Sequence, residues 1–138
     1  MSEEIFKEIQ LPKVTDHRGH LSFAEGNKHI PFDIARVYML YGMSDQIMRG
    51  GHAHWQLEQV LIAVSGKFKL HLDNGIEKRS LWLDDPSTGI YVNKMVWHEL
   101  DNFSEGAVCL SLASRHYSEP DYIRKYSDFK SAKLGIYE

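Results

Sequence analysis

Residues 49–59 read Arg-Gly-Gly-His-Ala-His-Trp-Gln-Leu-Glu-Gln, and two histidines stand two positions apart in this segment. Side chains alternate between the two faces of a β-strand, so we expect His52 and His54 to point the same way. If the strand continues, Glu58 shares their parity and is followed by alternate apolar residues up to Val64. The pattern predicts a polar cluster at one end of an otherwise apolar inward face.

Such a cluster supports two different chemistries. Two imidazoles and a carboxylate on one wall can hold a divalent metal ion. Without a metal, the same imidazoles can move protons near neutral pH, because an unperturbed histidine has a pKa of about 6.5. The residues alone leave both possibilities open.

The composition excludes several classes of protein. The chain has 138 residues, 43% of them hydrophobic, which suits one domain over residues 1–138 with a sizeable core. A net charge of −3 and the lack of a basic block give no reason to expect nucleic acid or an anionic membrane as a partner. The single cysteine excludes an internal disulfide. With no apolar signal stretch or membrane-length run, we expect a cytoplasmic protein.

Short segments with the period of β-strands fill most of the chain. Residues 67–72 alternate clearly, with Phe68, Leu70 and Leu72 on one face, and Asp-Asn-Gly at 73–75 is a hairpin signal. Roughly nine or ten such segments predict an all-β antiparallel barrel or jelly roll. Only the end favours a helix, with Ser118 as its cap and three aromatic residues on about one face, namely Tyr122, Tyr126 and Phe129.

Further candidate site residues surround the histidine pair in the predicted barrel. His98 lies in a second histidine segment, and Arg49 stands three residues before His52. Arg36 and Tyr38 share a strand face, so both are candidates for contact with a substrate. Arginine suits bidentate binding of phosphate, although for Arg18, Arg36 and Arg49 taken singly an ordinary surface ion pair is the commoner role.

The spacing of these residues resembles the motifs of the cupin family. His-x-His-x3-Glu at 52–58 corresponds to the first cupin motif, and His-x3-Asn at 98–102 to the second. In metal-binding cupins these positions supply three histidines and a glutamate. The resemblance implies a cupin-like β-barrel with His52, His54, Glu58 and His98 close together at its mouth.

Over nearly its whole length the chain resembles, more specifically, the dTDP-4-keto-6-deoxy-hexose 3,4-ketoisomerases of bacterial deoxysugar biosynthesis. The segments that carry this resemblance are residues 16–21, 30–32, 36–38, 49–54, 57–61, 91–92, 96–99, 113–114, 117, 121–126 and 129. The tail from residue 121 is not shared by generic cupins. The resemblance implies a dTDP-linked 4-keto-6-deoxy-glucose substrate, catalysis without a metal or other cofactor, and a homodimer with exchanged N-terminal strands.

The resemblance also implies roles for individual residues. The catalytic histidines of the family fall on His52 and His54, with Arg49 and Tyr38 beside them. As a hypothesis, His52 removes the C3 proton and His54 handles oxygen protons. Glu58 then orients an imidazole, and His98 bounds the substrate pocket. A histidine base of ordinary pKa predicts activity that rises through the histidine titration range.

Three alternatives stay open at this point. The first is a metal-dependent cupin enzyme, which Glu58 and His98 would complete. The second is a 3,5-epimerase acting on the same class of nucleotide sugar. The third is a sugar-nucleotide binding module without activity, although binding alone does not call for two potential bases on one wall. Trp97 and Tyr91 could stack on a flat ring or could be ordinary strand residues.

Overall fold

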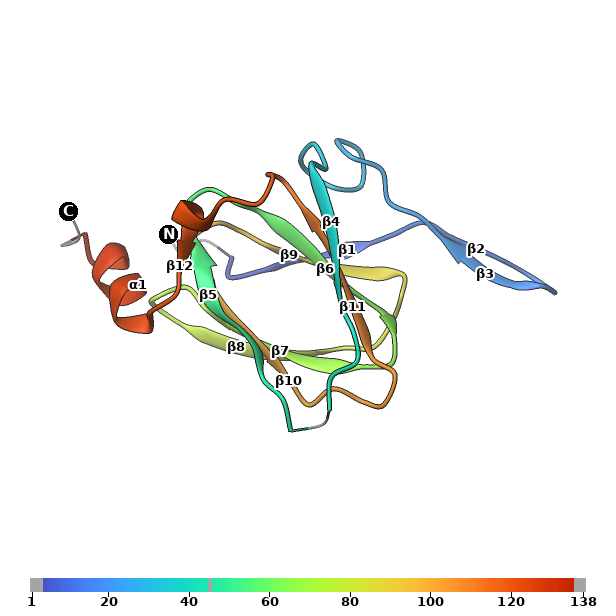
Figure 1. The fold of residues 1–138 in the computed structure, drawn as a ribbon. Helices are drawn as coiled ribbons and strands as arrows, with labels where there is room; N and C mark the ends of the chain where they lie inside the picture. Colours follow the sequence, from blue (N-terminus) through green and yellow to red (C-terminus); the bar gives the residue numbers. More distant parts are fainter. Residues whose placement is uncertain (1–3, 45, 136–138) are drawn as a thin grey trace.

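The computed structural model describes residues 4–44 and 46–135, and within them the chain forms two packed five-stranded sheets (Figure 1). The first sheet has the order β1-β9-β6-β11-β4, formed by Lys7–Gln10, Thr88–Val92, Gln59–Ser65, Val108–Ala113 and Arg36–Leu40. The second has the order β12-β5-β10-β7-β8, formed by Tyr122–Ile123, Arg49–His54, Trp97–Asp101, Phe68–Asp73 and Lys78–Leu83. All pairings within the sheets are antiparallel. The predicted all-β, cupin-like architecture is confirmed.

The main core lies between the two sheets. Phe68, Leu70 and Leu72 of β7 are at most 2% exposed, as their alternation predicts. They pack with Leu61 and Ala63 of β6 in one apolar cluster. Burying side chains of this size stabilises the fold by about 1.5–3 kcal/mol each, so this layer is the main force that holds the sheets together.

The strand of the histidines does not continue as expected. β5 ends at His54, and β6 begins at Gln59 in the opposite sheet. On β6, Gln59 therefore points into the space between the two sheets. Val60 and Ile62 are buried on the other face of the sheet, under the N-terminal segment. Since both faces of β6 are buried, its continuous apolar run carries no parity signal.

The N-terminal region forms two separate elements. It divides near Pro12 into β1 and a separate hairpin of β2 (Lys13–Asp16) and β3 (Gly19–Ser22). Proline cannot donate to a strand ladder, which explains the division. Within the described residues the hairpin pairs with no other strand, and it projects from the body of the molecule (Figure 1).

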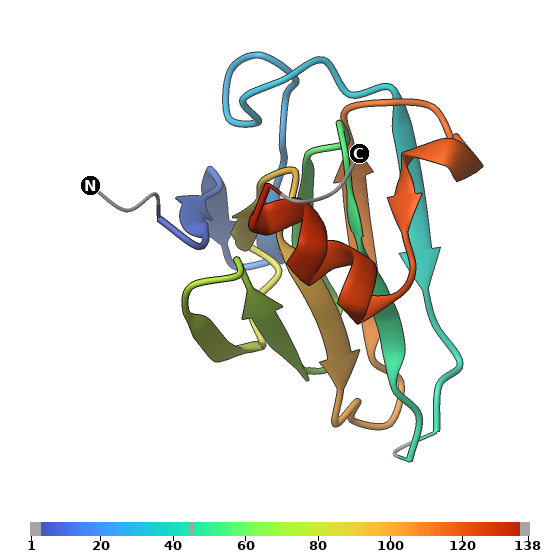
Figure 2. The ribbon, with the colours of Figure 1, turned by 90° about the vertical axis from the view of Figure 1, so that its left-hand side faces the viewer.

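The C-terminal region is not one helix from Ser118 but a series of three short elements over residues 119–133, which we call the strap. A short 3-10 turn at Glu119–Asp121 leads into β12, which pairs with β5, and helix α1 then spans Tyr126–Lys133 (Figure 2). Phe129 anchors the helix because it is fully buried against Trp97 and Ile123. No helix within residues 4–44 and 46–135 is long and apolar enough to cross a membrane.

Candidate active site

The three predicted histidines meet on the inner face of the second sheet. β5 and β10 are antiparallel neighbours, and His52 lies directly opposite His98. Their ring centroids are 4.6 Å apart, and those of His52 and His54 are 5.0 Å apart. The parity prediction for His52 and His54 therefore holds, and His98 joins them from the adjacent strand.

A glycine pair shapes this part of β5. The register between β5 and β10 shifts next to His98, where Gly50 and Gly51 adopt φ angles of 85° and 82°. A Cβ atom on Gly50 would lie 2.9 Å from the carbonyl oxygen of His98. Only glycine combines this backbone conformation with such a close approach, so the Gly-Gly sequence produces the bulge that precedes His52.

A cavity of about 240 Å³ opens beside the histidines. His52, His98 and Tyr38 line it, and so do the cationic residues Arg36, Arg49 and Arg124. His54 is only 4% exposed, and its ring packs 4.4 Å from that of Tyr122, which also lines the cavity. His52 is therefore the member of the pair that faces the open space.

Burial keeps all three imidazoles neutral. Desolvation, reinforced by the neighbouring His98, lowers the pKa of His52 to about 3. The same causes lower the pKa of His54 to about 2, and desolvation lowers that of His98 to about 4. Removing an imidazolium from water is costly, so near neutral pH these side chains carry lone pairs that can accept protons.

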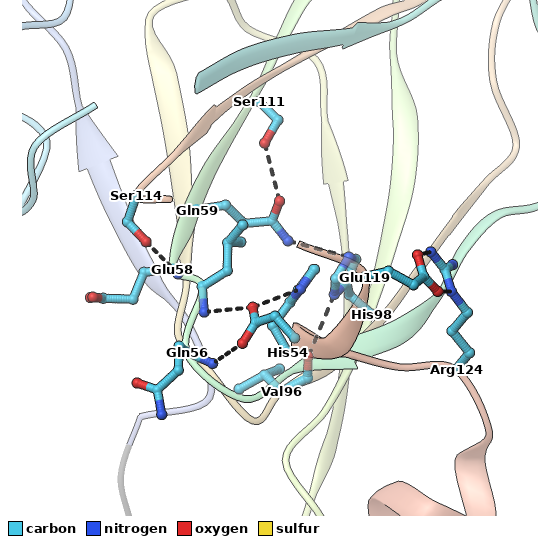
Figure 3. Close-up of polar contacts among 12 residues, drawn as sticks. His54, Gln56, Glu58, Gln59, Val96, His98, Ser111, Ser114, Glu119 and Arg124 are labelled. Carbon is cyan, nitrogen blue, oxygen red and sulfur yellow. Dashed lines mark hydrogen bonds and ion pairs between the residues drawn. The ribbon is translucent and has the colours of Figure 1, made fainter. Parts of the chain in front are cut away.

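Sequence reasoning missed a buried amide at the centre of the site. Gln59 is 1% exposed, and its Nε2 lies 3.2 Å from Nε2 of His98 (Figure 3). Its Oε1 accepts hydrogen bonds from Tyr38 at 2.8 Å and from Ser111 at 3.1 Å. In the sequence Gln59 follows Glu58 and only adjoins the apolar run 60–64, so its role is recognised from its burial, since a buried polar group requires partners.

The C-terminal strap supplies three further residues that were not assigned to the site from sequence. Asp121 accepts hydrogen bonds from the backbone N–H groups of Gln56 and Leu57, and its carboxylate lies 3.4 Å from Nδ1 of His54. Tyr122 pairs with His54 in the β12–β5 ladder. Arg124 lies 4.1 Å above the ring of Tyr122.

Arg124 also carries a charge that is partly balanced. It forms an ion pair with Glu119 through two hydrogen bonds of 2.6 and 2.8 Å, and this carboxylate also accepts a hydrogen bond from Tyr117. The hydrogen bond from Arg124 is the main cause that lowers the pKa of Glu119 to about 2. Glu119 therefore stays ionised and holds Arg124 at the edge of the cavity.

Glu58 does not join the histidines, contrary to the expectation from strand parity. It lies in the connection between β5 and β6, and its carboxylate accepts a hydrogen bond from the hydroxyl of Tyr91. Figure 3 shows its side chain directed away from His54 and His98. The cluster of metal-capable side chains found among the described residues consists of His52, His54 and His98.

Three other candidates lie apart from the cavity. Tyr91 packs against Phe32, and Trp97 is 7% exposed beneath helix α1, so neither aromatic ring is placed to stack on a ligand beside the histidines. Arg18 forms an ion pair with Asp16 on the projecting hairpin. By contrast, Arg36 does line the cavity, and its Nε is buried without a hydrogen-bond partner within the described residues.

A larger depression of about 470 Å³ lies on the outer face of the second sheet. Its lining includes His71, which bonds to Ser80 and Asp101, both at 2.7 Å. These polar groups satisfy one another. The smaller cavity, with its neutral histidines and an unpaired guanidinium nitrogen, is therefore the better candidate for chemistry.

Fold and site together define a cupin-like protein whose histidine cavity lies between two antiparallel sheets. A family model described as "FdtA: WxcM-like, C-terminal" matches residues 5–134. The chain belongs to this family.

Individual relatives agree with this assignment. The TDP-4-oxo-6-deoxy-alpha-D-glucose-3,4-oxoisomerase of Aneurinibacillus thermoaerophilus is 45% identical over 132 residues, covering 94% of this chain and 95% of the relative. A 3,4-ketoisomerase structure from Helicobacter canadensis has a TM-score of 0.91 and 40% identity, covering 94% of this chain and 97% of the other. A histidine-to-asparagine mutant of QdtA, a 3,4-ketoisomerase from Thermoanaerobacterium thermosaccharolyticum, was crystallised with TDP-4-keto-6-deoxyglucose. It has a TM-score of 0.94 and 39% identity, covering 97% of each chain.

Proposed function

We propose that this protein is a sugar 3,4-ketoisomerase that converts dTDP-4-keto-6-deoxy-D-glucose into a dTDP-3-keto-6-deoxy-hexose in deoxysugar biosynthesis. The observation that carries the proposal is the neutral histidine pair beside an arginine-lined cavity, in a chain with near full-length similarity to 3,4-ketoisomerases. Moving a ketone between adjacent carbons requires proton transfer at carbon and at oxygen. Neutral imidazoles perform both kinds of transfer.

The reaction starts at the C3–H bond, which the neighbouring C4 carbonyl makes acidic. His52 takes this proton because it faces the cavity as a neutral base, and the electron pair of the C–H bond forms an enediolate. Return of a proton to C4, with transfer of the oxygen proton from O3 to O4, gives the ketone at C3. One proton leaves C3, one returns to C4 and one moves from O3 to O4, so no atom or electron is gained or lost. His54, whose ring packs against that of His52, serves the oxygen protons.

The diphosphate of the substrate meets the arginine side of the cavity. Arg36, Arg49 and Arg124 bring three guanidinium groups to its lining. Guanidinium groups bind phosphate oxygens in a bidentate manner, which offsets the charge of the diphosphate and orients the sugar towards His52. The unpartnered Nε of Arg36 is the donor most in need of such an acceptor.

The experiment that tests this function is NMR of dTDP-4-keto-6-deoxy-glucose incubated with the protein in deuterated buffer. The ketoisomerase yields a 3-keto product with deuterium at C4. A 3,5-epimerase leaves the ketone at C4 and places deuterium at C3 and C5. A binding module without activity leaves the sugar unchanged and incorporates no deuterium. The epimerase result or the binding-module result would reject the proposal.

A metal-dependent reaction is the second candidate, because candidate ligand atoms of His52, His54 and His98 lie within 4.8 Å of one another. Against it, Nε2 of His98 is already engaged by Gln59, and Glu58 is directed elsewhere. Elemental analysis of protein purified without chelator, followed by assay after chelation, separates the two candidates. Stoichiometric metal together with loss of activity on chelation would favour the metal-dependent enzyme.

A homodimer with exchanged N-terminal strands is part of this proposal. Val14 and Leu21 on the projecting hairpin are each 58% exposed, and Phe23 beyond it is 42% exposed. A two-stranded hairpin is only marginally stable alone, and exposed apolar side chains on it favour docking against a second copy. Light scattering should give about twice the 16.0 kDa mass of the chain.

We further propose that residues 1–138 act as one domain, since both sheets share one core. The proposed location is the cytoplasm. A sugar nucleotide carries a charged diphosphate that does not cross a bilayer unaided, so its isomerase works in the compartment where the substrate is made. Fractionation of cells that express the tagged protein tests this location.

A further inference from the structure

The proton positions in the site can be deduced from one backbone carbonyl. Nδ1 of His98 lies 3.5 Å from the carbonyl oxygen of Val96. A carbonyl only accepts hydrogen bonds, so Nδ1 carries the proton of this imidazole. His98 is 2% exposed, and a buried imidazole without a counter-ion is neutral, so Nε2 holds a lone pair.

This tautomer fixes the orientation of the neighbouring amide. Nε2 of His98 requires a donor, and the NH₂ group of Gln59 at 3.2 Å supplies it. The amide oxygen of Gln59 must then face the opposite side, where it accepts from the hydroxyls of Tyr38 and Ser111. Each hydroxyl has one proton, so both hydroxyl protons are committed to Gln59.

We propose that Gln59 is a positioning residue that sets the direction of hydrogen bonding in the cavity. It holds His98 as the Nδ1–H tautomer with both ring nitrogens occupied, and it turns the hydroxyl proton of Tyr38 away from the substrate. Towards the cavity, Tyr38 then presents only lone pairs, and it accepts a hydrogen bond from a hydroxyl of the ligand. Proton transfer at carbon is left to His52.

The consequence for specificity rests on the proposed function. A Tyr38 oxygen that can only accept recognises a sugar carbon bearing a hydroxyl and offers nothing to a carbonyl oxygen at the same place. The substrate is thereby oriented with its hydroxyl, rather than its ketone, towards β4. A site whose polar groups are fixed in this way rejects analogues that lack the hydroxyl, since the lone pairs would then stay unpaired.

The first test is independent of any substrate. ¹⁵N-histidine NMR of the full-length protein at pH 7 reports which ring nitrogen of His98 is protonated, with His98→Asn used for assignment. We expect the proton on Nδ1, and a proton on Nε2 would overturn the proposal. The tautomer is read from the wild-type spectrum, and the variant serves only to identify the signal of His98 among the eight histidines.

Variants then show whether Gln59 sets the tautomer. In Gln59→Glu the carboxylate still accepts from Tyr38 and Ser111 but donates nothing to His98, so the His98 proton should appear on Nε2. Ser111→Ala is the matched control, because it removes one hydroxyl and leaves the Gln59–His98 contact, and its His98 tautomer should match wild type. An unchanged tautomer in Gln59→Glu would reject the role of Gln59.

Kinetics separate this inference from the proposed function. With active wild-type protein, Gln59→Glu should lower kcat by about 10- to 100-fold, because it reverses the His98 tautomer beside His52. KM should change less than about threefold, because the hydrogen bond from Tyr38, which orients the substrate hydroxyl, stays in place. Wild-type protein without isomerase activity would refute the function and leave the tautomer result standing. An active wild type with His98 protonated on Nε2 would refute the inference alone.

Discussion

Lowering the pH from 8 to 5 distinguishes a buried histidine base from an ordinary one. A histidine of pKa about 6.5 is only about 3% neutral at pH 5, so its kcat/KM would fall about 30-fold. Burial lowers the pKa of His52 to about 3, so the base stays almost fully neutral at pH 5. We therefore expect a nearly flat profile from pH 8 to 5 and a decline only below about pH 4.

The assay measures initial rates of 3-keto product formation at subsaturating substrate, because kcat/KM reports the titration of the free enzyme. Circular dichroism at each pH, and full recovery of activity on return to pH 8, show that the fold persists. His71→Asn serves as the matched control, since His71 lies on the outer face of the second sheet. An acid limb centred near pH 6.5 in both proteins would refute the desolvation argument.

Three mutations probe other parts of the structure. His52→Asn should lower kcat by about 10²- to 10⁴-fold, and more than His54→Asn, because His52 faces the cavity; steady-state kinetics with dTDP binding by calorimetry measures this. Phe129→Ala should cost about 3–5 kcal/mol in urea unfolding, since the ring is fully buried beneath α1. Leu21→Asp should shift the light-scattering mass from dimer to monomer, since it puts a charge in the proposed docking face.

Each of these predictions has a control and a contradicting result. If His54→Asn lost activity while His52→Asn kept it, the two proton-transfer roles would be reversed. Lys130→Ala on the same helix should change stability by less than about 0.5 kcal/mol, and a similarly small loss in Phe129→Ala would show that α1 is not anchored through its ring. Lys13→Ala on the hairpin should stay dimeric, and a dimeric Leu21→Asp would argue against docking through this hairpin.

Much of the architecture could be predicted because its strands are buried on only one face. β7 alternates cleanly between core and solvent, and the Asp-Asn-Gly turn after it fixes the hairpin to β8. β6 could not be oriented in this way, since neighbours cover both of its faces. The C-terminal segment was expected to be helical from its cap and aromatic spacing, but pairing of Tyr122 with His54 extends it as a strand.

The site residues also fall into those that a local sequence pattern predicts and those that depend on tertiary contacts. His52, His54 and His98 could be brought together from sequence because two of them share a strand and the third follows a motif spacing. Glu58 was placed wrongly because the chain leaves β5 after His54, and a local turn changes the face of every later residue. Gln59 and Asp121 reach the histidines only through tertiary contacts, which no local pattern records.

The strap also sets the order in which a newly made chain becomes competent. Synthesis runs from the N-terminus, so β5 is made more than sixty residues before Asp121, and β10 is made twenty residues before it. A nascent chain can thus form every strand pairing of the two sheets except β12–β5 while this wall of the cavity is still missing. The site would then become active only when β12 has formed. An mRNA truncated before β12 would encode a barrel with an open and inactive site.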